Sequence, residues 1–164
     1  NLRLPLDLAG DDRAQADAKV AAALELVGLK GFENHYPRQL SGGMQMRASI
    51  ARSLVTEPNL LLMDEPFGAL DEITRNKLDA DIIQLWWRKK LTVIFVTHSI
   101  YEAVFLSTRV IVMAARPGRV LKEVLIDEPH PRTDAFRVTQ KFAAYAKELS
   151  ELLAQASASG ASDL

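Results

Sequence analysis

Two adjacent carboxylates, Asp64 and Glu65, directly follow the apolar run LLLM. A short apolar run bounded by turn residues is typical of a strand that is buried on both faces of a parallel sheet. Ligands of open α/β sheets bind beyond the carboxyl ends of the strands. We therefore expect Asp64 to hold Mg²⁺, partly through water, and Glu65 to orient and deprotonate an attacking water, a role worth about 10²–10⁴ in rate. The alternative is that the segment DEP is only a charged turn.

His98 follows a second apolar run, TVIFVT. An imidazole at the end of a strand can donate a hydrogen bond to a terminal phosphate, although a histidine in this position can also be structural. Because parallel strands end at the same edge of a sheet, we expect His98 to lie beside Glu65. His35 and His130 have no comparable context, and we expect both to be exposed loop residues.

The segment LSGGMQ places small and polar residues in front of a helix-forming run. Ser41 is a suitable N-cap, Gly42 and Gly43 allow the backbone to approach an anion closely, and Gln45 adds a polar side chain. A helix N-terminus of this kind attracts phosphate, although the same residues also make an ordinary cap. The sequence contains no phosphate-binding loop of the form G-x-x-x-x-G-K-[ST], so the origin of such a phosphate has to be explained.

The elements that position these residues alternate between strands and helices. Asp71 can cap a long helix, so that strand 60–64, helix 71–88 and strand 92–97 form a right-handed βαβ unit. The start of the chain, with Pro5, is expected to be extended. The other expected elements are helices 12–27, 44–56, 101–106 and 134–153, and a hairpin of strands 110–114 and 120–126.

The bulk composition narrows the function classes. The chain has 164 residues, of which 48% are hydrophobic, and a net charge of −1, which suits one compact domain and gives no support for a nucleic-acid surface. It has no cysteine, which excludes disulfides and cysteine metal sites. Its apolar runs are shorter than the ~20 residues that span a bilayer. Because it opens on Asn1 without Met, we expect a piece of a longer protein.

Four segments in a fixed order carry a family resemblance. LSGGMQ, LLLMDEP, GALD and VTHS resemble the signature motif, the Walker B motif, the D-loop and the H-loop of the nucleotide-binding subunit of ABC transporters. The resemblance covers residues 1–132. The longer segments YPRQLSGGMQMRASIARSL and THSIYEAVFLSTRVIVMAARPGR are most similar to importers of nitrate, sulfonate, taurine and pyrimidine precursors.

The resemblance implies where each group acts. In this family two nucleotide-binding subunits meet head to tail, and the signature helix of each contacts the ATP held by the other. The segment Ser41–Gln45 would therefore bind the partner's nucleotide, and Asp71 of the D-loop would lie near both sites. Asp64, as Mg²⁺ ligand, and the catalytic pair Glu65 and His98 would serve the ATP of their own subunit.

The implied partners and cofactors follow from the same family. The cofactors are ATP and Mg²⁺, and the partners are a second nucleotide-binding subunit in a head-to-tail homodimer, a transmembrane permease and, indirectly, a periplasmic or surface solute-binding protein. No nucleic acid partner is expected. The implied location is the cytoplasmic face of the membrane, where ATP hydrolysis drives import of a solute.

The sequence departs from the family in three respects. The Walker A loop, the aromatic residue that stacks on adenine and the Q-loop glutamine would precede Asn1, so we expect the chain alone to be inactive as an ATPase. Met46 stands where the family usually has Gln or Lys, and Ser99 stands where Asp is commonest. Neither residue contacts phosphate in this interpretation, so both are expected to be tolerated.

Two other functions remain open. One is an ABC-type ATPase of DNA repair or translation, but the short cysteine-free segment between LSGG and THS argues against it. The other is a non-catalytic remnant or regulatory fragment that keeps the fold.

The expected fold is α/β. The resemblance implies a parallel sheet core like that of P-loop NTPases, with helices on both faces and a helical signature subdomain, incomplete at the amino terminus. We expect the helical subdomain at 1–57, the catalytic core portion at 58–132, a C-terminal helix at 133–154 and a disordered tail at 155–164.

Overall fold

The computed structural model describes residues 1–115 and 117–161, with side chains described outside 157–161. The chain divides into an amino-terminal unit, Asn1–Val96, and a carboxyl-terminal unit, Thr97–Leu164. Over the described residues it is an α/β structure with one parallel and one antiparallel pair of strands.

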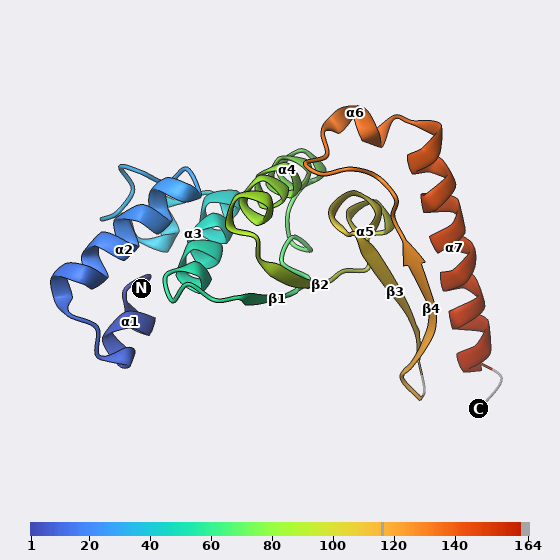
Figure 1. Ribbon diagram of the computed structural model, residues 1–164, viewed down its shortest axis with the longest axis horizontal. Helices are drawn as coiled ribbons and strands as arrows, with labels where there is room; N and C mark the ends of the chain where they lie inside the picture. The colour runs from blue at the N-terminus through green and yellow to red at the C-terminus, as the bar shows by residue number, and fades with distance from the viewer. Residues whose placement is uncertain (116, 162–164) are drawn as a thin grey trace. The chain divides into compact units, whose positions relative to one another are not determined.

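Helices dominate the first half of the amino-terminal unit (Figure 1). They are α1 (Leu4–Ala9), α2 (Arg13–Leu26), the 3₁₀ turn η1 (Pro37–Gln39) and α3 (Gly42–Leu54). Buried side chains of α1, α2 and α3, together with Val55, form one cluster: Leu6, Ala16, Ala23, Ala51 and Val55. The extended start expected from Pro5 is wrong, because α1 begins there with proline in its first turn, where its missing N–H has no partner to lose.

The helix expected at 12–27 is confirmed as α2, and local contacts define both of its ends. The carboxylate of Asp12 accepts from the backbone N–H groups of Ala14 and Gln15, at 3.0 and 3.4 Å, as an N-cap does. Past the carboxyl end, Gly28 has φ 71°, a left-handed conformation that glycine adopts without steric conflict.

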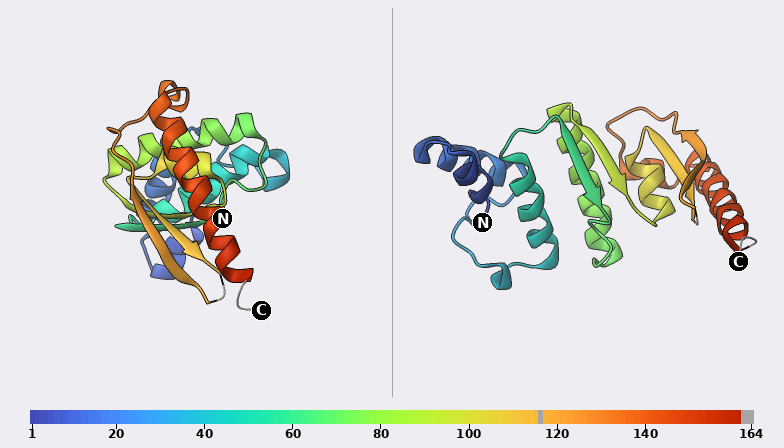
Figure 2. Two further views of the ribbon diagram at one scale, coloured as in Figure 1. Left: turned by 90° about the vertical axis from the view of Figure 1, so that its right-hand side faces the viewer. Right: turned by 90° about the horizontal axis from the view of Figure 1, so that it is seen from below.

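The strands β1 (Leu60–Asp64) and β2 (Thr92–Val96) form a parallel pair joined through α4 (Glu72–Lys89). Their register pairs Leu62 with Ile94 and Asp64 with Val96, so both strands end at the same edge of the sheet, as the βαβ pattern predicts. The helix α4 runs beside the pair (Figure 2).

The burial of β1 differs from the expectation. Its side chains alternate between exposed and buried, so one face of the pair is covered and the other is open. The open face carries Leu60, Leu62, Ile94 and Val96, which are 48–68% exposed. A continuous apolar run shows that both faces suit burial, but it does not show that the described residues cover both.

The carboxyl-terminal unit packs helices on an antiparallel hairpin. It contains α5 (Ile100–Leu106), β3 (Arg109–Ala114), β4 (Arg119–Leu125), α6 (Asp134–Arg137) and α7 (Gln140–Ala161). Figure 1 shows α7 along the hairpin. Phe105, Phe136 and Phe142 are at most 5% exposed, and the rings of the last two meet edge to face at 5.1 Å. The hairpin expected from the sequence is confirmed.

The end of the chain differs from its expected division. The single helix expected at 133–154 consists of α6 and α7, separated by Val138 and Thr139. The segment expected to be a disordered tail, 155–164, continues α7 as far as Ala161, and residues 162–164 lie outside the described residues. Small residues such as those of ASASGA permit a helix when the preceding turns already fix its direction.

Arg132 is a charged residue buried in the carboxyl-terminal unit. Only 3% of it is exposed, and its Nη1 donates to the backbone oxygens of Val104, Phe105 and Ser107 at 2.8–2.9 Å. Its Nη2 donates to Ile126 O and Glu128 O at 3.3 and 3.1 Å. One guanidinium therefore joins the carboxyl end of α5, whose last carbonyls lack partners within the helix, to the segment after β4. Burial lowers the pKa of Arg132 to about 10.

The segment before Arg132 contains His130, which the sequence led us to expect exposed. The residue is half-buried. Burial first, and the charge of Arg132 second, lower the pKa of His130 to about 4, so the imidazole is neutral near pH 7. The expectation was wrong because burial of a loop residue depends on distant packing.

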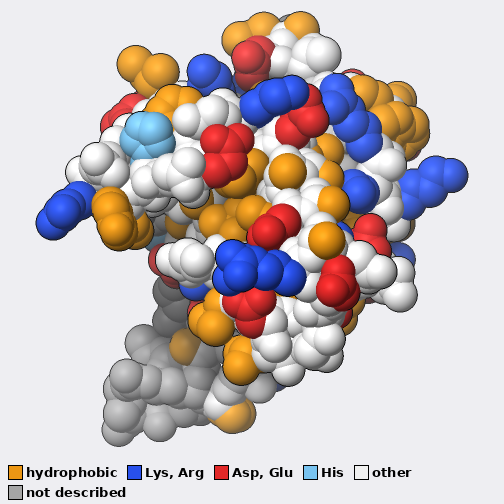
Figure 3. Space-filling model, turned by 90° about the vertical axis from the view of Figure 1, so that its left-hand side faces the viewer, with side chains coloured by type: hydrophobic (Ala, Val, Ile, Leu, Met, Phe, Trp, Pro, Cys, Tyr) orange, Lys and Arg blue, Asp and Glu red, His pale blue; other side chains and the backbone are white. Residues whose placement is uncertain are grey.

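Charged side chains of both signs are interspersed on the face shown in Figure 3. Ion pairs of the amino-terminal unit include Arg3–Asp17 and Lys19–Asp11, at 3.2 and 2.6 Å. Among the helices of the described residues, none combines the length and the apolar character needed to cross a bilayer.

Candidate functional site

The glycine-containing segment after Leu40 forms the start of α3. Ser41 is the N-cap, and its Oγ accepts from the backbone N–H of Met44 at 3.3 Å. The helix begins at Gly42, two residues earlier than the sequence suggests. The first N–H groups of any helix have no partner within it, so this end of the thirteen-residue α3 can receive an anion.

Both glycines lie against residues around the start of α4. A Cβ on Gly43 would lie 2.8 Å from Cγ2 of Thr74, and one on Gly42 would lie 3.2 Å from Cδ2 of Leu70. The close approach that these glycines allow within the chain is therefore to Leu70 and Thr74. This contact fixes the start of α3 relative to the start of α4.

Gly43→Ala is expected to lower the free energy of unfolding of the amino-terminal unit by about 1–3 kcal/mol relative to Gly42→Ala, since both variants gain the same helix propensity. The new methyl would meet Cγ2 of Thr74, which is on a β-branched side chain with little rotamer freedom. Urea denaturation followed by circular dichroism measures the loss.

Gly42→Ala is the matched control, because the side chain of Leu70 can rotate away and alanine favours a helix by about 1 kcal/mol. The double variant Gly43→Ala/Thr74→Ser, which lacks Cγ2, should recover stability. An equal loss in both glycine variants would show that the contact with Thr74 is not the cause.

The side chain of Gln45 is directed to the preceding turn. Its Nε2 donates to the backbone oxygens of Pro37 and Leu40, at 3.0 and 3.1 Å. Gln45 therefore holds η1 and the residue before Ser41 in place, a role that its position in the sequence did not reveal.

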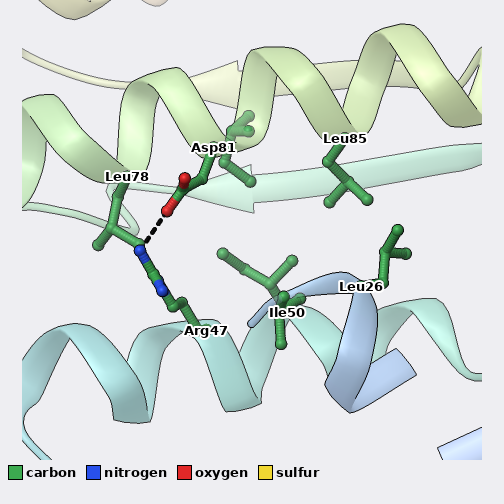
Figure 4. Close-up of a pocket in the computed structure, with 8 residues that line it drawn as sticks. Leu26, Arg47, Ile50, Leu78, Asp81 and Leu85 are labelled. Atoms are coloured by element: carbon green, nitrogen blue, oxygen red, sulfur yellow. Dashed lines mark hydrogen bonds and ion pairs between the residues drawn. The ribbon is translucent and has the colours of Figure 1, made fainter. Parts of the chain in front are cut away.

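A small pocket lies between α3 and α4 in the same unit (Figure 4). Ile50, Leu78 and Leu85 line it, and Leu26 closes it from α2. An ion pair between Arg47 of α3 and Asp81 of α4 lies beside these apolar side chains. Sequence reasoning missed this pair, because residues 34 positions apart show no local pattern.

Asp64 and Glu65 occupy the end of β1, where the sequence places them. Asp64 is its last residue and is exposed. Glu65 has φ 42°, and its N–H donates to Val96 O at 2.8 Å. A Cβ on Gly68 would lie 3.6 Å from Oε2 of Glu65, so the carboxylate lies over this glycine. The turn thus fixes the backbone of Glu65 against the last residue of β2.

A buried aromatic residue anchors the loop between β1 and α4. Phe67 is 1% exposed, and its ring lies 5.6 Å from that of Phe95. Asp71 then caps α4, accepting from the N–H of Thr74 at 2.9 Å. This backbone hydrogen bond is the main cause that lowers the pKa of Asp71. Asp71 therefore acts as the helix cap that the sequence predicts.

His98 belongs to the carboxyl-terminal unit, two residues beyond Val96. Its side chain is exposed, and it lies between Thr97 and Ser99, the N-cap of α5. The other predicted site residues, from Ser41 to Asp71, all belong to the amino-terminal unit. The proximity of His98 to Glu65 stays a prediction.

The carboxylates suit a magnesium ion that also binds phosphate. Within the described residues, no three His, Cys, Asp or Glu side chains group closely enough to hold a metal ion by themselves. Mg²⁺ in phosphate sites is commonly held by one or two carboxylates together with water and substrate oxygens. The exposed Asp64, with Glu65 beside it, provides this donor set.

Comparison with known proteins finds a matching family model and several similar ATP-binding proteins. A family model described as ABC transporter matches residues 3–68. An uncharacterised ABC transporter ATP-binding protein of Methanocaldococcus jannaschii is 46% identical over 93% of this chain and 56% of that protein. The aliphatic sulfonates import ATP-binding protein SsuB of Bacillus cereus is 48% identical over 77% of this chain and 50% of its own length.

A second SsuB protein, from Bacillus licheniformis, is 49% identical over 74% of this chain and 48% of its own length. The chain thus spans about half the length of the curated relatives that it matches. The chain belongs to the ABC transporter family of ATP-binding proteins.

Proposed function

We propose that this chain provides the signature, Walker B, D-loop and H-loop parts of an ATP-hydrolysing subunit of an ABC importer. The observation that carries the proposal is the turn at Glu65. Its backbone N–H is bonded to Val96 at the end of β2, so the backbone that carries this carboxylate is fixed at the sheet edge where α/β proteins bind ligands.

Asp64 and Glu65 divide the work at this edge. Asp64 would hold Mg²⁺, which when bound neutralises charge on the β- and γ-phosphates of ATP. Glu65 would orient a water and accept its proton. Its fixed backbone limits the positions that the carboxylate can reach, and a fixed base is what proton abstraction from a positioned water requires.

His98 would donate a hydrogen bond to the terminal phosphate from the segment after β2. An imidazole suits this task, because it donates in its neutral form as well as in its charged form. Asp71 would lie at the boundary between two subunits, where its role as the cap of α4 fixes the D-loop in front of it.

The start of α3 would bind the nucleotide of a second subunit. The Oγ of Ser41 accepts from Met44, and its hydroxyl hydrogen is available to donate to phosphate. The backbone N–H groups of Gly42 and Gly43 would add donors at the positive end of the helix. Gln45 would act by holding the turn before Ser41.

The importer assignment rests on the relatives. Two of them are named as import proteins for aliphatic sulfonates, and an anionic organic solute of this kind is the transported substrate that we propose. The subunit would work as a head-to-tail homodimer at the cytoplasmic face of the membrane, bound to a permease that receives solute from a binding protein.

A heterodimer tests the head-to-tail arrangement. The chain is joined to a Walker A segment from SsuB, and two defects are combined, Ser41→Arg and loss of the Walker A lysine. Arginine at position 41 is too large for a phosphate to approach Gly42 and Gly43. If the segment Ser41–Gln45 acts on the partner's nucleotide, placing the defects in different subunits leaves one site intact, whereas placing both in one subunit damages both sites.

The ATPase rates of the two purified heterodimers decide the arrangement. We expect the heterodimer with split defects to retain more activity than the one with both defects in one subunit. The reverse ranking would mean that Ser41 serves the nucleotide of its own subunit. Absence of ATPase activity in the wild-type joined protein would contradict the proposed function itself.

A further inference from the structure

Three hydrogen bonds surround His98 on its own segment. The Oγ1 of Thr97 accepts from the backbone N–H of Ser99 at 2.9 Å and donates to the carboxylate of Glu102. The Oγ of Ser99 accepts from the backbone N–H of Glu102 at 3.3 Å. The backbone before and after His98 is therefore held by one hydroxyl, which is itself held by Glu102.

This arrangement differs from the usual start of a helix. In a capping box, the glutamate at the third helical position reaches back to the N–H of the N-cap residue. Here the N-cap Ser99 gives its N–H to Thr97, and Glu102 holds the hydroxyl of Thr97. Because the Thr97 hydroxyl accepts from the N–H of Ser99, it closes a turn around the residue between them, His98.

The difference in burial between Glu102 and His98 supports the same interpretation. Glu102 is only 4% exposed, whereas His98 is exposed. Burying a carboxylate is unfavourable unless hydrogen bonds compensate, and a solvent-exposed cap would start α5 without that penalty. The buried position lets Glu102 reach Thr97 from beneath the turn and leaves the imidazole outside.

We propose that Glu102, acting through Thr97, is a positioning residue for His98: it fixes the backbone on both sides of the imidazole, so that the ring keeps one direction. The inference rests on the proposed role of His98 at a terminal phosphate. A donor at a reacting phosphate acts only in the correct geometry, because a misplacement of about 1 Å can lower a rate 10²-fold.

Amide hydrogen exchange of the 164-residue chain tests the structural half of the proposal. Thr97→Val keeps the shape of the side chain and removes the hydroxyl, and it should raise the exchange rate of the Ser99 amide up to about tenfold, the range of one lost hydrogen bond. Thr97→Ser keeps the hydroxyl and is expected to restore slow exchange. Glu102→Ala should resemble Thr97→Val, and Glu102→Gln, which can still accept from Thr97, should lie between them and the wild type.

The amides of α7 around Phe142 provide the internal control for global stability. If the exchange rates of these amides rise in proportion to that of the Ser99 amide, Thr97 and Glu102 stabilise the whole unit rather than the turn. The proposal is then overturned. If the Ser99 amide exchanges as fast in Thr97→Ser as in Thr97→Val, the hydroxyl is not what slows its exchange. This result would also overturn the proposal.

ATPase kinetics of the chain joined to a Walker A segment test the functional half. Thr97→Val should lower kcat about 10- to 100-fold and leave the KM for ATP close to its original value. His98→Ala should lower kcat at least as much. Because Thr97 acts through His98, the double variant Thr97→Val/His98→Ala should be no slower than His98→Ala alone.

Additive losses in the double variant would overturn the proposal, because Thr97 would then act independently of His98. An inactive wild-type joined protein would be a failure of the proposed function, and it is distinguished from a failure of the positioning role by the exchange result, which needs no nucleotide.

Discussion

Glu65→Gln is expected to lower the ATP turnover of the chain joined to a Walker A segment by about 10²–10⁴, the contribution of a general base. The amide keeps the size of the side chain but cannot accept the proton of the attacking water. ATP affinity should stay close to that of the wild type, because Ser41, Asp64 and the phosphate-binding loop are untouched. Steady-state phosphate release and equilibrium binding of a nucleotide measure the two effects.

Glu148→Gln is the matched control, since Glu148 is an exposed glutamate on α7. It should leave turnover unchanged. The 164-residue chain without a Walker A segment should release no phosphate in the same assay. Normal turnover by Glu65→Gln would show that Glu65 is not the base, and loss of nucleotide binding would indicate a role in the ground state.

The second large effect concerns stability. Arg132→Met is expected to lower the free energy of unfolding of the carboxyl-terminal unit by at least about 3 kcal/mol, because one hydrogen bond to a charged group is worth about 1.5–3 kcal/mol and the buried carbonyls lose their donor. Methionine fills much of the volume beside Phe136, whose ring lies 5.4 Å from the guanidinium carbon. Chemical denaturation followed by far-ultraviolet circular dichroism measures the loss of stability.

Two variants separate charge loss from geometry. Arg132→Lys keeps the charge, but its single ammonium group cannot reach both α5 and the segment after β4 in the way that a planar fork does, so its stability should lie below that of the wild type. Arg119→Met removes an exposed arginine of β4 and should change stability by less than about 0.5 kcal/mol. If Arg132→Met also changed stability by less than about 0.5 kcal/mol, water would have replaced the guanidinium as the donor to the buried carbonyls.

Local patterns predicted most of the elements that carry the site. Asp71 caps α4 where the sequence places it, because a helix cap depends on a few adjacent residues. The parallel pairing of β1 and β2 also follows from the crossover through α4. The roles of Asp64, Glu65 and His98 stay predictions.

The features that the sequence did not reveal depend on distant partners. Arg132 bonds to Val104, 28 positions away, and Arg47 pairs with Asp81 across two helices. The open face of the β1–β2 pair is equally invisible to a local pattern, because the apolar run LLLM has the same appearance whether one face or both are covered. The apolar residues of a strand indicate which of its faces can be buried. Which faces are in fact covered depends on how the rest of the chain folds.

The left-handed backbone of Glu65 bears on how this position can change over generations. Glutamate at positive φ is disfavoured by roughly 1 kcal/mol or more relative to glycine, and asparagine also tolerates that conformation. Selection for a stable fold alone would therefore replace Glu65 with one of these residues. Its retention would instead have to be maintained by selection on activity, so a lineage that lost the reaction would be free to drift toward glycine and become more stable as it did so.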